Sequence, residues 1–194
     1  KMNHPSSEQI YRILIFNQFF PPDFAATGQL IEELAIGISR QGIKVRVFSG
    51  QPGYAFDTIE APRKEVKGRL QVRRSRVTKI LPLGILAKIL NSSLFFTRAF
   101  LHTLRHQQKE DLLIITTAPA FMTWLGYLSH GIWKKKYICL IYDLYPNVLT
   151  QLGMFSENHP IVKLWHKLNE KTWLNAEEII VLSSSMKDRI VEVC

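Results

Sequence analysis

Short apolar runs alternate along this chain with longer stretches in which apolar residues recur every three or four positions. The first run, ILIF at residues 13–16, is typical of a buried strand, and residues 30–39 carry apolar side chains at helical spacing. Continued along the chain, the alternation predicts strands at residues 11–16, 44–49, 70–77, 112–116, 136–142 and 178–182, and helices at residues 30–39, 83–105, 117–133, 160–175 and from 183 onward, with a short helix or turn within 144–155. Strand–helix–strand units cross over right-handed and require a parallel sheet. The pattern therefore predicts an α/β fold, a Rossmann-like, doubly wound, mainly parallel sheet with helices on both faces.

Residues 1–10 fall outside this pattern. They are mostly polar, contain no hydrophobic segment of a signal peptide, and place a lysine before Met2. We expect residues 1–10 to be a tag remnant and a polar N-terminal segment, and residues 11–194 to form a single domain. A chain of 194 residues, 46% hydrophobic and 21% charged, is long and apolar enough to build one such core.

Doubly wound sheets bind their ligands beyond the carboxyl ends of the strands. The predicted strands bring five segments to that rim: residues 17–28, 50–54, 117–119, 143–147 and 183–185. In the first of them, NQFFPPDFAATG, two prolines stiffen the loop, Thr27 is a candidate N-cap, and Gly28 leaves space where helix amides emerge. Such a helix start favours a phosphate, and an ordinary strand-to-helix turn has the same composition. The loop contains neither G-x-G-x-x-G nor G-x-x-x-x-G-K-[ST].

Two further rim segments carry polar side chains that could meet a substrate. Asp143 follows the strand at 136–142, where a carboxylate can orient a sugar hydroxyl, act as a base, or simply cap the next helix. Asn147 can fill the same roles. The hydroxyl of Thr117 can bind substrate, and capping alone would also explain a threonine at this position.

The positive charge of the chain is concentrated in one segment. The net charge is +9, and residues 63–79 contain eight basic residues and one acid, Glu65. This segment precedes the strongly apolar helix at 83–105, a combination suited to the surface of an anionic membrane. The alternatives are a solvated strand followed by a core helix and, less favoured because aromatics do not interleave with the bases, a nucleic-acid site. The residues that we expect to face the membrane are Arg69, Arg73, Arg74, Arg76 and Lys79.

Cysteine and histidine do not form a recognisable metal or redox motif. Cys139 lies within an apolar run, which predicts a reduced core residue and a reducing compartment. His102 and His106 have the i, i+4 spacing of a zinc pair, but neighbouring ligands are missing, so we predict that they lie on a solvated helix face. No D-x-D occurs, and we expect no cofactor and no bound metal.

Taken together, these segments resemble the N-terminal domain of family-4 glycosyltransferases of GT-B fold. Residues 11–50 match the family's first strand, loop and helix, with Thr27 in the place of the first glycine of the loop. Residues 116–153, with TAPA and DLYP, look like the branch that synthesises bacterial exopolysaccharides and O-antigens, and residues 176–183 (AEEIIVLS) resemble the family's A-D-x-I-x-x-x-S. One departure is Tyr142, which stands where many members carry histidine.

The resemblance implies a mostly retaining, metal-independent enzyme that transfers a sugar from a nucleotide-sugar donor to a saccharide acceptor, often lipid-linked, in cell-surface polysaccharide synthesis. It implies catalytic roles for Asp143 and Gly28 and binding of the donor diphosphate by Thr27 and Gly28. The acceptor would be bound by Asp23, Phe24, Tyr54, Thr117, Asp143, Tyr145 and Asn147. It also implies a cytoplasmic location, peripheral on the inner face of the plasma membrane, with an anionic membrane surface and no nucleic acid among the partners.

In this family the nucleotide-sugar site and its E-x7-E motif lie in a second domain. That second domain is absent from this sequence, which stops at Cys194, so we expect residues 11–194 to be the acceptor-side half and to be inactive alone. The alternative is a self-contained, non-catalytic α/β module that binds a membrane or a ligand. A nicotinamide-dependent oxidoreductase is disfavoured because the glycine fingerprint is missing.

Overall fold

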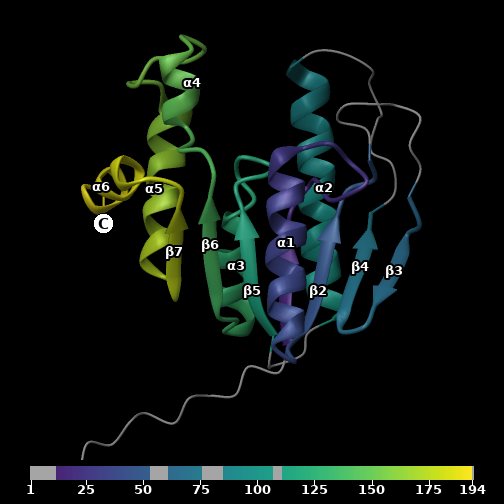
Figure 1. Ribbon diagram of the computed structural model, residues 1–194. Helices are drawn as coiled ribbons and strands as arrows, with labels where there is room; N and C mark the ends of the chain where they lie inside the picture. Colours follow the sequence, from purple (N-terminus) through teal and green to yellow (C-terminus); the bar gives the residue numbers. More distant parts are fainter. Residues whose placement is uncertain (1–11, 53–60, 76–84, 107–110, 194) are drawn as a thin grey trace, which may run out of the picture.

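The centre of the molecule is a seven-stranded sheet with strand order β3-β4-β2-β1-β5-β6-β7 (Figure 1). The computed structural model describes residues 12–52, 61–75, 85–106 and 111–193. The strands are β1 (Arg12–Phe16), β2 (Lys44–Ser49), β3 (Lys64–Lys67), β4 (Leu70–Arg74), β5 (Asp111–Thr116), β6 (Tyr137–Ile141) and β7 (Glu178–Val181). The neighbours pair in parallel, except β3 and β4, which are antiparallel. The predicted doubly wound, mainly parallel α/β sheet is confirmed.

The strand order reverses at the middle of the sheet. In β1, Ile13 lies opposite Val45 of β2 on one side and opposite Leu112 of β5 on the other. The chain first builds outward from β1 through β2 to β4 and β3, and then returns to add β5, β6 and β7 on the opposite side of β1. The strand order therefore reverses between β1 and β5, and sheets of this kind bind their ligands beyond the carboxyl ends of the strands at such a point.

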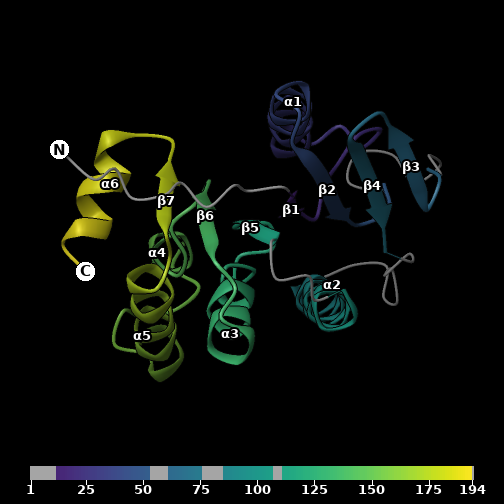
Figure 2. The ribbon, with the colours of Figure 1, turned by 90° about the horizontal axis from the view of Figure 1, so that it is seen from below.

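Helices cover both faces of the sheet (Figure 2). One face carries α1 (Ala26–Arg40), and the other carries α2 (Ile85–Arg105), α3 (Trp124–Trp133) and α5 (Pro160–Leu174). The short helix α4 (Asn147–Gln151) lies at the rim, and α6 (Ser184–Val191) lies beside the edge strand β7. Alternation of side chains along each strand explains this two-faced packing, because successive residues of a strand point to opposite faces.

The apolar side chains form two buried clusters, one on each face. Under α1, Ile31 and Ala35 are fully buried against β1 and β2, as their helical spacing predicts. On the other face, Phe16 and Phe48 pack with Phe95 of α2. Complete burial of a large apolar side chain contributes about 1.5–3 kcal/mol, so these two clusters hold the helices on the sheet.

Several boundaries differ from the predictions. Strand β3 was not predicted, because KEVK is largely polar and is extended only through antiparallel pairing with β4. Helix α1 begins at Ala26, before the predicted start at residue 30, and the strand predicted at 70–77 is described as far as Arg74. Helix α3 begins at Trp124 rather than at residue 117, because hydrogen-bonded turns occupy the intervening residues.

Candidate functional site

The loops that follow β1, β2 and β5 are joined to one another by backbone hydrogen bonds at the carboxyl edge of the sheet. The amide of Gly50 donates to the carbonyl oxygen of Gln18 at 2.8 Å, and the amide of Gln18 donates to the carbonyl oxygen of Ala118 at 2.9 Å. Loops from three neighbouring strands thus form one continuous rim. This arrangement agrees with the prediction that these segments lie together.

Thr117 extends the rim to β6. Its Oγ1 accepts hydrogen bonds from the amides of Tyr142 at 3.0 Å and Asp143 at 3.4 Å. The side chain therefore holds the end of β6 against the loop that follows β5. Its hydroxyl hydrogen is not used in these two bonds, so it can still donate to a ligand.

Asn17 was not predicted as a site residue, yet it organises the first loop. Its side chain is fully buried, its Nδ2 donates to the Phe19 carbonyl oxygen at 2.6 Å, and its Oδ1 accepts from Thr116 Oγ1 at 2.7 Å. The bonds tie the loop after β1 to the end of β5 at the strand-order reversal. The available signal was a polar side chain directly after a fully apolar strand, because buried amides require partners.

The start of α1 differs from the expected phosphate site. Ala25, in extended conformation, is the N-cap residue and makes no side-chain cap bond, so the prediction that Thr27 is the N-cap is wrong. The amide of Gly28 donates to the Ala25 carbonyl oxygen at 2.9 Å, so it is not directed at a ligand. Thr27 and Ala26 lie in the first turn, whose amides lack intrahelical acceptors.

Gly28 is buried where the first loop crosses the helix. A Cβ atom at this position would lie 3.3 Å from the Phe19 carbonyl carbon and 3.3 Å from the Phe20 nitrogen. The absence of a side chain is therefore explained by close packing of loop backbone on α1.

The remaining predicted residues of the first two loops have different environments. Asp23 is buried, and its amide donates to the Phe20 carbonyl oxygen at 3.2 Å. Phe24 is 60% exposed and extends toward solvent. Tyr54 lies outside the described residues.

The loop after β6 brings a carboxylate and an aromatic ring to the rim. Asp143 is exposed, and Asn147 is the first residue of α4 and partly exposed. Burial, together with the negative charge of Asp143, raises the pKa of Tyr145. The backbone carbonyl of Tyr145 accepts a hydrogen bond from Asn169 Nδ2 at 2.6 Å, which fixes this loop to α5.

Tyr142 does not present its hydroxyl group to the rim. The residue is buried in the cluster under α1, and its Oη has no hydrogen-bond partner within the part of the chain that the structure describes. Burial raises the pKa of Tyr142 to about 12, so the phenol is neutral near pH 7. The exposed polar group at this strand end is therefore the neighbouring Asp143.

The basic segment does not form a single outward-facing surface. Arg69 and Arg73 are exposed, whereas Arg76 and Lys79 lie outside the described residues. Arg74 was predicted to face a membrane, and this prediction is wrong. Its guanidinium is buried, pairs with Glu65 Oε2 at 3.0 Å and donates to the Pro21 carbonyl oxygen at 2.6 Å.

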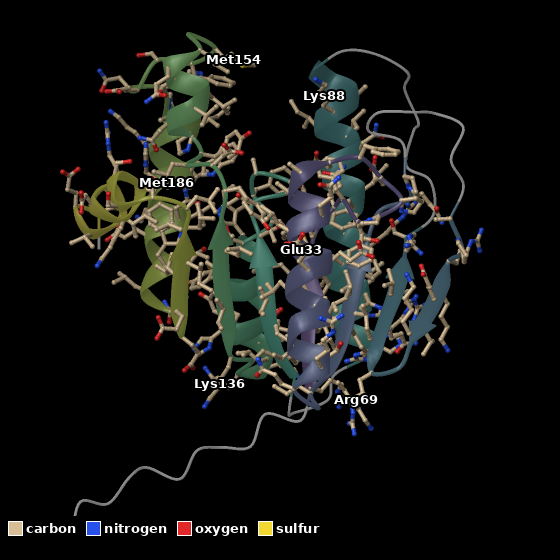
Figure 3. The ribbon with its side chains drawn as sticks, in the orientation of Figure 1. Glu33, Arg69, Lys88, Lys136, Met154 and Met186 are labelled. Atoms are coloured by element: carbon tan, nitrogen blue, oxygen red, sulfur yellow. The ribbon has the colours of Figure 1, made fainter. Side chains whose placement is uncertain are left out.

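The basic segment and the start of α2, which together were expected to face a membrane, lie at opposite ends of the view in Figure 3. Arg69, at the β3–β4 turn, lies at the lower end of the view, and Lys88, near the start of α2, lies at the upper end. The rim is at the upper end, where the strands terminate. None of the described helices is both long and apolar enough to cross a membrane.

His102 is not solvated, contrary to the prediction. It is buried, with its ring stacked on Phe48 at 4.7 Å and on His106 at 4.3 Å. Burial, followed by the charges of His106, Arg73 and Arg46, lowers the pKa of His102 to about 3. Among the described residues, no group of three or more metal-ligating side chains is present. Cys139 is a buried, free thiol whose pKa burial raises to about 12, as expected for a core residue.

Comparison with known proteins gives structural matches. No family model matches the chain, and a search of curated proteins found no match. Sucrose-phosphate synthase from Thermosynechococcus elongatus aligns with a TM-score of 0.66 and 10% identity, over 93% of this chain and 44% of that one. A UDP-forming α,α-trehalose-phosphate synthase from Burkholderia xenovorans aligns with a TM-score of 0.58 and 10% identity, over 95% and 42%.

A structure named as trehalose-6-phosphate from E. coli bound with UDP-2-fluoro glucose aligns with a TM-score of 0.58 and 8% identity, over 94% of this chain and 42% of that one. The chain therefore spans less than half the length of each of these structures. At such identities the likeness shows the fold. The chain has an α/β, Rossmann-like fold that matches part of each of these structures.

Proposed function

We propose that this chain is the acceptor-binding half of a glycosyltransferase that moves a sugar from a nucleotide-sugar donor to a saccharide acceptor. The observation that carries the proposal is the continuous polar rim at the strand-order reversal of a GT-B half-domain fold. The names of the matched structures support it, because they include sugar-phosphate synthases and a complex with a UDP-sugar analogue.

In this proposal the loop after β6 orients the acceptor. The exposed carboxylate of Asp143 accepts a hydrogen bond from the attacking hydroxyl, and the Thr117 hydroxyl and Asn147 amide bind neighbouring hydroxyls. Asp23, Phe24, Tyr54 and Tyr145 complete the acceptor site, as the family resemblance implies. A carboxylate beside the reacting hydroxyl contributes both position and a proton acceptor.

The start of α1 stabilises the leaving diphosphate. Negative charge develops on that group as the sugar departs, and the amides of Ala26 and Thr27, with the positive end of the helix dipole, favour it. Gly28 contributes indirectly, because its missing side chain lets the backbone of Phe19 and Phe20 pack on the first turn of α1, while its own amide is bonded to Ala25. The family resemblance adds retention of configuration and independence from metal ions to the proposal.

We further propose that the acceptor is lipid-linked and that the protein works in cell-surface polysaccharide synthesis at the cytoplasmic face of a membrane. The support is an exposed apolar and basic group at the rim end of α2, where Ile89 is 52% exposed and Leu90 is 47% exposed beside exposed Lys88. Such a group suits an anionic membrane surface.

The nucleotide site requires a second half-domain in this proposal, because the chain spans less than half of each matched structure. The test begins with the sequence of the polypeptide that carries these residues, followed by an assay of the complete protein with radiolabelled nucleotide sugars. We expect sugar transfer, and we expect Asp143→Asn to lower kcat/KM by about 100-fold or more. Glu33→Gln, at an exposed position on the middle of α1, serves as the control.

Two outcomes would contradict the proposal at different levels. Wild-type kcat/KM in Asp143→Asn would remove this carboxylate from the chemistry. Absence of both sugar transfer and donor hydrolysis by the complete protein, with every common nucleotide sugar, would overturn the transferase function.

A further inference from the structure

Five aromatic side chains form a continuous strip across the helices on the face opposite α1. Ring centroids lie 5.7 Å apart for Phe96–Phe121, 5.9 Å for Phe121–Trp124, 5.3 Å for Trp124–Trp165 and 6.2 Å for Tyr145–Trp165. These separations are typical of interacting rings. We call these five residues the aromatic strip.

The aromatic strip approaches the rim. Trp124 is the first residue of α3, Trp165 lies in the second turn of α5, and Tyr145 lies in the loop after β6. Tyr145 is only two residues beyond Asp143, whose charge influences the pKa of its phenol. One end of the aromatic strip therefore adjoins the exposed carboxylate of the candidate site.

The five residues of the aromatic strip are partly exposed, in contrast to the fully buried aromatic residues of the core, although Trp165 Nε1 is itself buried and Phe96 packs against the core cluster. Phe16, Phe95 and Tyr137 are fully buried on the same face of the sheet. Those residues, with their aliphatic neighbours, fill the space between the helices and the sheet. The strip adds aromatic surface that remains partly open to solvent, and partly exposed aromatic residues beside polar groups are typical of binding sites.

A buried amide holds the strip in one arrangement. Asn169 is 4% exposed, and its Oδ1 accepts from Trp124 Nε1 at 3.0 Å while its Nδ2 donates to the Tyr145 carbonyl oxygen at 2.6 Å. These two bonds fix the indole of Trp124 and the loop that carries Tyr145. A surface fixed in this way loses little conformational entropy when a ligand binds.

We propose that the aromatic strip is a stacking platform for a pyranose ring of the acceptor saccharide, with Asp143 and Asn147 bonded to its hydroxyls. This inference rests on the proposed function. A pyranose has an apolar face of C–H groups and an edge of hydroxyls, so it matches an aromatic surface that adjoins a carboxylate and an amide. An alkyl chain would match the rings but not the carboxylate.

The experiment uses the indole N–H signals of the four tryptophans in ¹H–¹⁵N NMR spectra of this chain. The probes are methyl β-D-glucopyranoside and methyl β-D-galactopyranoside, added up to about 100 mM because a single ring of this size binds with a dissociation constant of about 1–10 mM. We expect saturable shifts of the Trp124 and Trp165 signals. Trp173, buried in the core, and Trp133, packed on Phe100 at the other end of α3, should not shift.

Variants provide matched controls. Trp165→Leu should weaken pyranoside binding about tenfold or more, Trp165→Phe should retain part of it, and Trp133→Leu should leave it unchanged. Circular dichroism establishes that each variant is folded. Unchanged binding by folded Trp165→Leu would overturn the platform.

Two other results would also overturn the inference. One is the absence of saturable indole shifts with both pyranosides, and the other is equal shifts with 1-hexanol, which would identify an alkyl site. Both leave the transferase function standing, because that function is tested by sugar transfer. Conversely, pyranoside binding in a protein that transfers no sugar would contradict the proposed function and not the platform.

Discussion

Two glycines of α1 meet different surroundings, although they lie on the same helix. A Cβ on Gly28 would press on the backbone of Phe19 and Phe20 at 3.3 Å, whereas nothing lies within 4 Å of a Cβ on Gly37. We expect Gly28→Val to lower the free energy of unfolding by about 1–3 kcal/mol through overpacking. Gly37→Val should change it by less than about 0.5 kcal/mol. Urea denaturation of both variants checks this, and equal values would refute the packing role.

His102 predicts a pH dependence of stability. Burial lowers its pKa from 6.5 to about 3, so between these values the unfolded chain binds more protons at this residue than the folded chain does. His102 therefore does not lower the free energy of unfolding above pH 6.5. As the pH falls below 6.5, the free energy of unfolding declines by up to about 1.4 kcal/mol per pH unit.

The check is urea denaturation between pH 7.5 and about 5. His102→Phe, which preserves the stack on Phe48, should show a shallower loss of stability at low pH than the native chain. His166→Gln, on the partly exposed side of α5, is the control and should retain the native slope. If His102→Phe and the native chain lose stability in parallel, the buried neutral histidine is not the cause.

For single residues, the sequence predicted which loops form the rim, but it did not predict the hydrogen bonds that hold these loops. Asp143 and Thr117 could be chosen because strand ends are predictable from apolar runs. Asn17 and Arg74 could not, because their roles depend on carbonyl oxygens supplied by distant segments. Arg74 carries the charge of a surface residue, and only the fold reveals Glu65 and the Pro21 carbonyl around its guanidinium.

At the scale of elements, the strands and helices with an apolar stripe were predicted well, and those without one were not. Residues 44–49 were predicted as a strand and form β2. Basic and apolar residues alternate at the start of KVRVFS, and the strand is buried on both faces of the sheet. Strand β3 has no such signal, since it exists through pairing with β4. The start of α3 was misplaced because Pro119 suits both a helix start and the turns that precede Trp124.

Arg74 connects three elements of the structure. It joins the end of β4 to Glu65 of β3 and to the first rim loop at Pro21. We expect Arg74→Met to lower the free energy of unfolding by about 2–3 kcal/mol, because it leaves the carbonyl oxygens of Pro21 and Pro62 without their donor and removes one of the two cations paired with Glu65, which keeps Lys67. Arg73→Met, at the adjacent exposed position, should cost less than about 1 kcal/mol. Equal losses in urea denaturation would contradict the connecting role.

For the whole molecule, our proposal makes this fold one wall of a site. The chain covers 44% of the sucrose-phosphate synthase that it matches, and in our proposal the nucleotide is bound mainly by a second half. We therefore expect this chain alone to bind UDP-glucose with a dissociation constant weaker than about 1 mM in isothermal titration calorimetry. Micromolar binding by the isolated chain would contradict the half-site.

The hydrogen bonds along the rim have a mechanical consequence. Gly50 is bonded to Gln18, Gln18 to Ala118, and Thr117 to the end of β6, so no loop of this series is displaced without breaking a bond to its neighbour. The series spans the central strands of the sheet, which are themselves held by ladders of backbone bonds. In our proposal, closure around a ligand would therefore move this domain as a rigid body about a hinge, and would not be the folding down of a single lid.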